Sequence, residues 1–126
     1  MGGYAVAFHG HPRYTGDIDL FIEPSADNSR VLSTVLDDFG FGELNIGSAD
    51  FVREDMILQL GFPPNRIDIM TSIDGVSFSQ AWPKRVSAVI DGLEMVFISR
   101  ELLIQNKLAS GRAKDVADAE ELSRPD

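Results

Sequence analysis

The sequence contains no cysteine. Disulfide bonds, thiolate metal sites and cysteine nucleophiles are therefore all excluded. Apolar runs are short as well, and none approaches the ~18 residues that a membrane-spanning helix needs. A secretory signal has a basic stretch that leads into an apolar one, and the segment from Met1 to Tyr4 has no such pattern. We therefore expect a cytoplasmic protein that does not use a membrane.

Basic residues are scarce. Eleven Lys and Arg stand against 20 Asp and Glu, so the formal net charge at pH 7 is −9. A field of this sign repels phosphate backbones, and broad nucleic-acid binding is not expected. The same excess is compatible with a local basic patch that holds one nucleotide, and with carboxylates gathered around divalent cations.

The remaining composition is that of a globular domain. The chain has 126 residues, of which 44% are hydrophobic and 25% charged. This length is typical of a single domain, and no repeat or linker divides it, so we expect one domain over residues 1–126.

Local patterns predict an α+β domain with a mixed sheet flanked by helices. Ser25 and Ser99 are expected helix N-caps, and Asp91-Gly92 is a two-residue hairpin turn. The expected helices cover residues 3–9, 26–39, 48–54, 77–84, 99–109 and 113–122, and the expected strands cover residues 17–23, 56–62, 66–71, 86–90 and 93–98.

Two carboxylates, Asp17 and Asp19, open the first predicted strand. Residues two apart on a strand project from the same face, with Cα atoms ~6.6 Å apart. Two carboxylates held side by side repel each other, and a hard cation such as Mg²⁺ bound between them turns this repulsion into a favourable interaction. The apolar run from Leu20 to Ile22 predicts that this strand lies in the core. For an isolated Asp-x-Asp, the simpler interpretation is a pair of exposed carboxylates.

Neighbouring residues favour a site for metal and phosphate. Thirteen residues separate Gly2-Gly3 from the pair, and the segment Arg13-Tyr14-Thr15 lies just before it. Glycine lets backbone amides approach a phosphate closely, and a helix N-terminus favours the anion. Gly2, Gly3, Arg13 and Thr15 are therefore candidates for binding phosphate.

At this point the sequence resembles the polymerase-β-like nucleotidyltransferase superfamily. Gly2-Gly3, followed by Asp17-Ile18-Asp19 and an apolar run, looks like its signature. The stretch from Gly2 to Ile22 is close to a small prokaryotic branch, which includes toxin–antitoxin-associated, lincosamide-type and minimal nucleotidyltransferases. In those relatives a helix and a strand normally precede the glycine pair, whereas this sequence starts at Met1, so either the start is truncated or the usual first strand has been lost.

The resemblance implies a third carboxylate on a neighbouring strand. Asp68, between Ile67 and Ile69, stands in that place, and the alternative is an outward-facing residue of an amphipathic strand. Asp74 is a rival, although Asp74-Gly75 is typical of a turn.

The C-terminal part also resembles that branch. Lys107, Arg112 and Lys114 are three of the eleven cations within eight residues, and they would bind the triphosphate tail. The alternative for Lys107 is a lysine that extends from an apolar helix face, packed on the sheet, into solvent. Asp115 and Asp118 are expected to favour the last helix through its dipole, with residues 118–121 mostly solvated.

The function that the resemblance implies is transfer of a nucleoside monophosphate from a nucleoside triphosphate to an acceptor hydroxyl. Asp17, Asp19 and Asp68 would hold two Mg²⁺, or Mn²⁺, spaced ~3.5–4 Å apart. The acceptor would be a small molecule, a tRNA end or a protein side chain. The alternative is an inactive relative that binds a partner protein, as one half of a toxin–antitoxin pair.

Overall fold

A computed structural model describes residues 1–10, 17–38, 40, 55–62 and 65–124. Arg13, Thr15 and the helix expected over residues 48–54 lie outside this part. The described elements, in chain order, are α1 (Gly2–Phe8), β1 (Asp17–Phe21), α2 (Ala26–Asp38), β2 (Ile57–Phe62), β3 (Asn65–Met70), α3 (Phe78–Ala81), η2 (Trp82–Lys84), β4 (Val86–Ile90), β5 (Leu93–Phe97), α4 (Arg100–Ser110) and α5 (Ala113–Ser123).

The predicted element types and order are confirmed for the described residues, and so is the α+β class. The predicted caps are also present, because the Ser99 hydroxyl accepts from the amide of Leu102. Ser25 does the same for Asn28 at the start of α2. Asp91 and Gly92 both have positive φ, 53° and 79°, which is the conformation expected of a tight hairpin turn.

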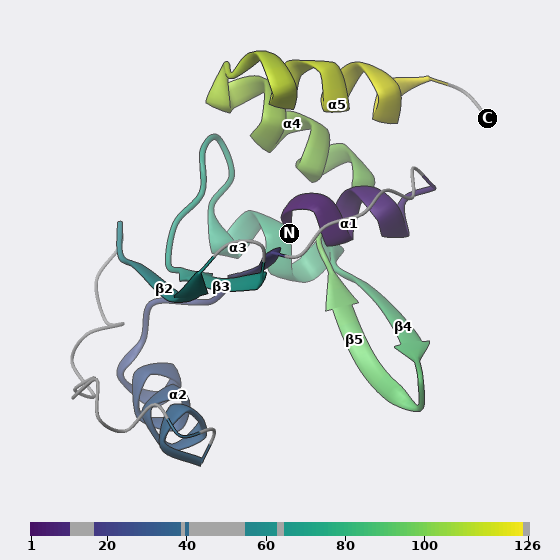
Figure 1. Cartoon of the computed structure of the whole chain (residues 1–126). Helices are drawn as coiled ribbons and strands as arrows, with labels where there is room; N and C mark the ends of the chain where they lie inside the picture. Colours follow the sequence, from purple (N-terminus) through teal and green to yellow (C-terminus); the bar gives the residue numbers. More distant parts are fainter. Residues whose placement is uncertain (11–16, 39, 41–54, 63–64, 125–126) are drawn as a thin grey trace.

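The strands form two sheets rather than one. The first has the order β1-β3-β2, with β1 parallel and β2 antiparallel to β3, and the hairpin β4-β5 stands apart as a second sheet. Figure 1 shows the hairpin projecting from the body of the molecule. The predicted mixed sheet is the three-stranded one, and in the part of the chain that the structure describes the hairpin is not part of it.

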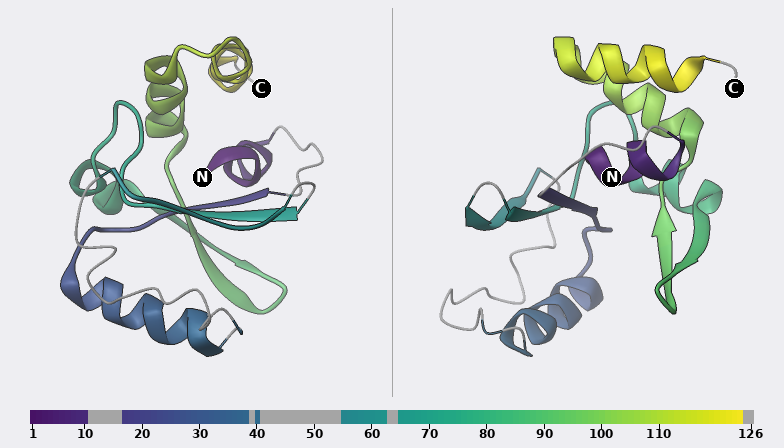
Figure 2. Two further views of the ribbon diagram at one scale, coloured as in Figure 1. Left: turned by 60° about the vertical axis from the view of Figure 1, so that its left-hand side comes forward. Right: turned by 45° about the vertical axis from the view of Figure 1, so that its right-hand side comes forward.

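Each face of the three-stranded sheet packs against a different helix. On one face, Leu36 of α2 packs with Leu60 and Ile69. On the other face lies α1, whose Ala5 and Val6 belong to the larger core cluster with Leu103 of α4. Figure 2 shows α1 between the three-stranded sheet and the pair α4–α5. The sequence had predicted that α4 packs on the sheet, but α4 packs on α1 instead.

The first strand is only half in the core. Leu20 is 45% exposed and Ile18 38%, because β1 lies at an edge of the sheet and α2 covers mainly the residues of β2 and β3. The apolar run from Leu20 to Ile22 had predicted a strand within the core. That prediction is wrong for Leu20 and holds better for the partly buried Phe21, which packs against the larger cluster.

Candidate functional site

The face of the sheet beneath α1 carries three carboxylates. Asp17 and Asp19 alternate with the exposed Ile18 and Leu20, so they share a face as their spacing predicts. The strand register places Asp19 directly beside Asp68 of β3. Asp68 is only 7% exposed. Facing neighbours on paired strands lie ~5 Å apart, so the two carboxylates lie in each other's field.

This crowding affects Asp19. Burial raises the pKa of Asp19, and the negative charges of Asp68 and Asp17 raise it further. Ionising Asp19 therefore costs more free energy here than in water, and a cation bound beside it would offset that cost.

Asp68 has a cationic partner on its own strand. The guanidinium Nη2 of Arg66 donates a hydrogen bond to Oδ2 of Asp68 at 3.0 Å. Nε of Arg66 lies 2.8 Å from Oδ1, a close ionic contact without the alignment of a hydrogen bond. The register also sets Arg66 beside Asp17. Arg66 was not singled out from the sequence, although its position two residues before Asp68 on one strand was the available signal.

The carboxylates line a cleft of about 1260 Å³, a volume sufficient for a nucleotide. Its walls include the carboxylate face of the sheet, the first turn of α1, and cationic residues from α4, α5 and the turn between them. Eight of the sequence-predicted residues line it, namely Gly2, Gly3, Asp17, Asp19, Asp68, Lys107, Arg112 and Lys114. Asp74 lines it too, but from a turn, in which its carbonyl accepts from Nδ2 of Asn106.

The backbone at Gly2 lies directly against the carboxylate of Asp19. A Cβ added to Gly2 would overlap Oδ2 of Asp19, and the φ of Gly2 is +57°, a conformation that other residues rarely adopt. A side chain at this position would therefore displace Asp19. Glycine is required here for the carboxylate and the start of α1 to approach each other.

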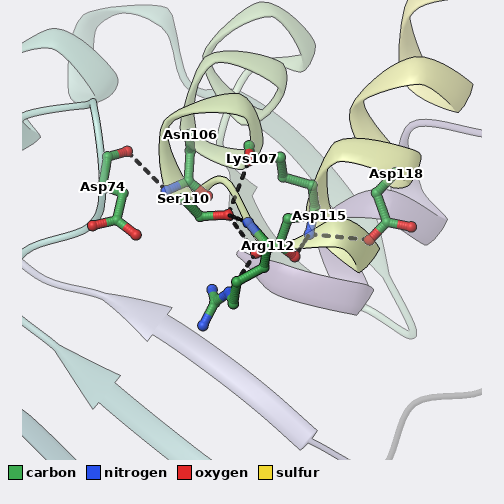
Figure 3. A network of polar contacts seen from close by, with 7 residues as sticks. All are labelled: Asp74, Asn106, Lys107, Ser110, Arg112, Asp115 and Asp118. Atoms are coloured by element: carbon green, nitrogen blue, oxygen red, sulfur yellow. Dashed lines mark hydrogen bonds and ion pairs between the residues drawn. The ribbon is translucent and has the colours of Figure 1, made fainter.

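Lys107 is held by carboxylates of the next helix. It is 6% exposed, and its Nζ lies 3.2 Å from Oδ1 of Asp115 and 3.2 Å from Oδ2 of Asp118 (Figure 3). The alternative in which Lys107 reaches into solvent is therefore wrong. Asp118, at 8% exposure, and the adjacent Ala119, at 1%, are not solvated either, and Asp118 contacts Lys107 of α4.

Asp115 links this lysine to Arg112. Burial opposes its ionisation, but hydrogen bonds from Ser110, Arg112 and Lys107 outweigh that cost and hold the pKa of Asp115 at about 2. Figure 3 shows these groups converging on the turn between α4 and α5. The Arg112 side chain is 76% exposed while its Nε stays 2.8 Å from Oδ2 of Asp115, so the guanidinium is oriented yet accessible to a ligand.

In the described part of the chain, no three His, Cys, Asp or Glu side chains are placed to hold a metal ion together. Asp68 is instead engaged by Arg66. The three carboxylates still fit a hard cation chemically. They are oxygen donors on one sheet face, and the buried Oδ1 of Asp68 has no hydrogen-bond donor.

Residues 1–123 match the family described as nucleotidyltransferase of unknown function (DUF6036). The chain belongs to this nucleotidyltransferase family. Its nucleotidyltransferase-like fold therefore agrees with the resemblance carried by Gly2-Gly3 and Asp17-x-Asp19. The match covers nearly the whole chain and both walls of the cleft.

No curated protein matches the chain. Separately, none of the described helices is long and apolar enough to cross a membrane.

Proposed function

We propose that the chain is a metal-dependent nucleotidyltransferase that moves a nucleoside monophosphate from a nucleoside triphosphate to an acceptor hydroxyl. The family supports a nucleotide substrate. The observation that carries the proposal is the cleft itself, because it sets carboxylates on one wall against Arg112 and Lys114 on another. A metal-bound triphosphate needs both kinds of group within one site.

The carboxylate wall is the proposed metal site. Asp17 and Asp19 would hold Mg²⁺ or Mn²⁺, and Asp68 would complete the site on the acceptor side. When bound, two such ions neutralise phosphate charge and lower the pKa of the attacking hydroxyl.

The cationic wall is the proposed site for the triphosphate tail. Arg112 presents an exposed guanidinium that Asp115 holds in place, and a guanidinium can bind phosphate oxygens with two parallel hydrogen bonds. Lys107 contributes charge to the same wall. It also orients Asp115, because its ammonium contacts that carboxylate. Gly2 and Gly3, in the first turn of α1, line the same cleft, and their amides have no intrahelical acceptors.

In the proposed reaction, the acceptor oxygen forms a bond to the α-phosphorus while the bond to the leaving oxygen of pyrophosphate breaks. The proton of the acceptor hydroxyl passes to Asp68. Positioning and charge neutralisation account for most of the catalysis, as in phosphoryl transfer generally. The C-terminal motif of Lys107, Arg112 and Lys114 supports membership of the lincosamide-type or toxin–antitoxin-associated branch.

Isothermal titration tests the proposal directly. The chain is titrated with each nucleoside triphosphate in the presence and absence of Mg²⁺, and we expect binding that requires the metal. Mass spectrometry of small molecules, RNA and proteins after incubation with labelled triphosphates then identifies the acceptor. Absence of triphosphate binding at millimolar Mg²⁺ would overturn the proposal.

One observation favours a second candidate, a catalytically inactive module that binds a partner protein, as in a toxin–antitoxin pair. Arg66 already neutralises Asp68, the proposed third metal ligand. If Arg66 stays on Asp68 when metal is present, the site lacks a free acceptor-side ligand. The two candidates differ in one result, since an inactive module transfers no label to any acceptor even where it binds nucleotide.

A further inference from the structure

The hairpin β4-β5 exposes an unusual amount of apolar surface. Val89 is 73% exposed and Leu93 67%, and four more of its large apolar side chains, Val86, Ile90, Met95 and Val96, are 36–47% exposed. A two-stranded hairpin alone is marginal in water, and exposed apolar patches of this kind mark interaction sites. This surface lies away from the carboxylates of the candidate site (Figure 1).

One face of the hairpin is apolar along its whole length. The register pairs Val86 with Phe97, Ala88 with Met95 and Ile90 with Leu93 on that face. At the base of the hairpin, Phe97 and Ala88 pack against the larger core cluster. Towards the tip the same face continues beyond the body of the protein (Figure 2), so its outer half has no covering element among the described residues.

Neither outer edge of the hairpin pairs with a described strand, and the edge of β4 is the more open of the two. The end of β5 is covered by the end of α1. The ring of Phe8 stacks on that of Phe97 with 4.1 Å between their centroids, and Nε2 of His9 donates a hydrogen bond of 2.8 Å to the carbonyl of Ile98. The outer edge of β4 pairs with no described strand. An unpaired edge is a template for another strand.

The sequence of β4 is complementary to itself in the antiparallel sense. With a two-fold axis at Ala88, Val86 lies opposite Ile90 of a second copy and Ser87 lies opposite Val89. The residues that flank the strand then pair by charge, Arg85 with Asp91. Residues in such facing positions share a face, so the apolar faces of the two hairpins become continuous.

Charge across the whole chain also favours the hairpin as the point of contact. Two copies of a protein with net charge −9 repel each other. The segment 84–97 carries two cations, Lys84 and Arg85, and two anions, Asp91 and Glu94, so its net charge is zero. Arg85 is anchored at the strand end, with its guanidinium carbon 3.9 Å from the centre of the Trp82 ring and Nη1 donating to the Trp82 carbonyl. A guanidinium has five N–H groups, so this contact is compatible with a carboxylate partner.

We propose that the chain forms a two-fold symmetric homodimer through antiparallel pairing of β4 with β4 of a second copy. The two hairpins become one four-stranded sheet, and Arg85 of each copy pairs with Asp91 of the other. The interface uses the same patch on both copies, which is the closed arrangement expected of a dimer.

A cysteine cross-link tests the register, because the chain has no cysteine of its own. Ala88→Cys places two thiols at the two-fold axis, where facing Cα atoms lie ~4.5–5.5 Å apart and permit a disulfide. Val96→Cys, at an exposed site on β5, is the matched control. We expect Ala88→Cys to form a covalent dimer under mild oxidation and Val96→Cys to remain largely monomeric. Equal cross-linking at both sites, or none at Ala88→Cys, would overturn the proposed register.

Charge exchange tests the pairing without oxidation. Arg85→Glu and Asp91→Lys each set like charges opposite each other twice, so each should raise the dimer dissociation constant by about tenfold. An equimolar mixture restores both attractive pairs and should form a heterodimer. Sedimentation velocity over a concentration series measures this, with Arg124→Glu, a distant exposed charge change, as control. Circular dichroism melts confirm that each variant is folded. A wild-type chain that stays monomeric throughout, or single variants that dimerise as the wild type does, would overturn the dimer.

Discussion

Arg66 and Asp68, two residues apart on β3, form an ion pair on the carboxylate face of the sheet. Nη2 of Arg66 donates to Oδ2 of Asp68 at 3.0 Å, and Nε lies 2.8 Å from Oδ1. A metal ion that takes Asp68 as a ligand therefore competes with this guanidinium for the carboxylate. The pair also explains why Asp68 can be nearly buried as a carboxylate beside Asp19.

Replacing Arg66 by Gln should tighten metal binding several-fold, because it removes a cation that competes for Asp68. Mn²⁺ titration followed by electron paramagnetic resonance measures the affinity without any reaction. Arg66→Lys keeps the charge but not the forked geometry, so its Mn²⁺ affinity should lie between those of the wild type and Arg66→Gln. Weaker Mn²⁺ binding in Arg66→Gln would mean that Arg66 orients Asp68 for the metal and does not compete with it.

The double variant Asp17→Asn, Asp19→Asn should melt a few degrees higher than the wild type in the absence of metal. Neutralising the two groups removes the repulsion between them and the cost of burying a charge, which are the effects that raise the pKa of Asp19. The same variant should lose the rise in melting temperature that Mg²⁺ produces in the wild type. Thermal melts with and without Mg²⁺ measure both effects, and an unchanged Mg²⁺ response would remove these residues from the metal site.

Gly2→Ala should weaken metal binding while the rest of the domain stays folded. The added Cβ overlaps Oδ2 of Asp19, and the positive φ of Gly2 strains any other residue. Mn²⁺ titration of this variant is compared with that of Gly92→Ala, which carries similar strain at a hairpin turn where an added Cβ meets no neighbour. Equal metal affinity in the two variants would show that Gly2 does not position Asp19.

Lys107→Met should lower the free energy of unfolding by about 3 kcal/mol, because it leaves Asp115 and Asp118 partly buried without their cation. Chemical denaturation measures this loss. Lys114→Ala, at an exposed lysine of α5, is the control and should have little effect on stability.

The role of Lys107 in binding needs a second measurement. Lys107→Met should weaken triphosphate binding much more than nucleoside binding, since the charge acts on the phosphate tail. Equal losses for both ligands would assign Lys107 to helix packing alone.

Acid should destabilise the α4–α5 junction through Asp115. Its pKa is about 2 in the folded chain against an ordinary 3.8, so the ionised form is stabilised by folding. This contribution is fully present above about pH 4 and is lost as the pH falls towards about 2. Asp115→Asn should therefore lose less stability than the wild type across that range. Melts at several pH values measure the difference, with the exposed Asp27→Asn as control. Parallel curves for wild type and Asp115→Asn would contradict the assignment.

Features that depend on neighbouring residues were predictable from the sequence. Ser99 caps α4, Asp91-Gly92 turns the hairpin, and Asp17 and Asp19 share a face, because capping, turn conformation and the two-residue period of a strand are properties of short segments. The glycine pair and the two carboxylates also indicated the family, because the motif is defined by residue types at a fixed spacing along the chain.

Other features arise only when distant segments come together. The position of Asp68 beside Asp19 depends on the register between β1 and β3, which are separated by more than forty residues. The enclosure of Lys107 between Asp115 and Asp118 depends on the packing of α5 against α4, and the sequence did not indicate it. Burial and ion pairing are decided by such long-range packing, and so is the separation of the hairpin from the main sheet. The sequence by itself therefore determined which groups the site contains, and the tertiary structure decided which of them are paired, buried or exposed.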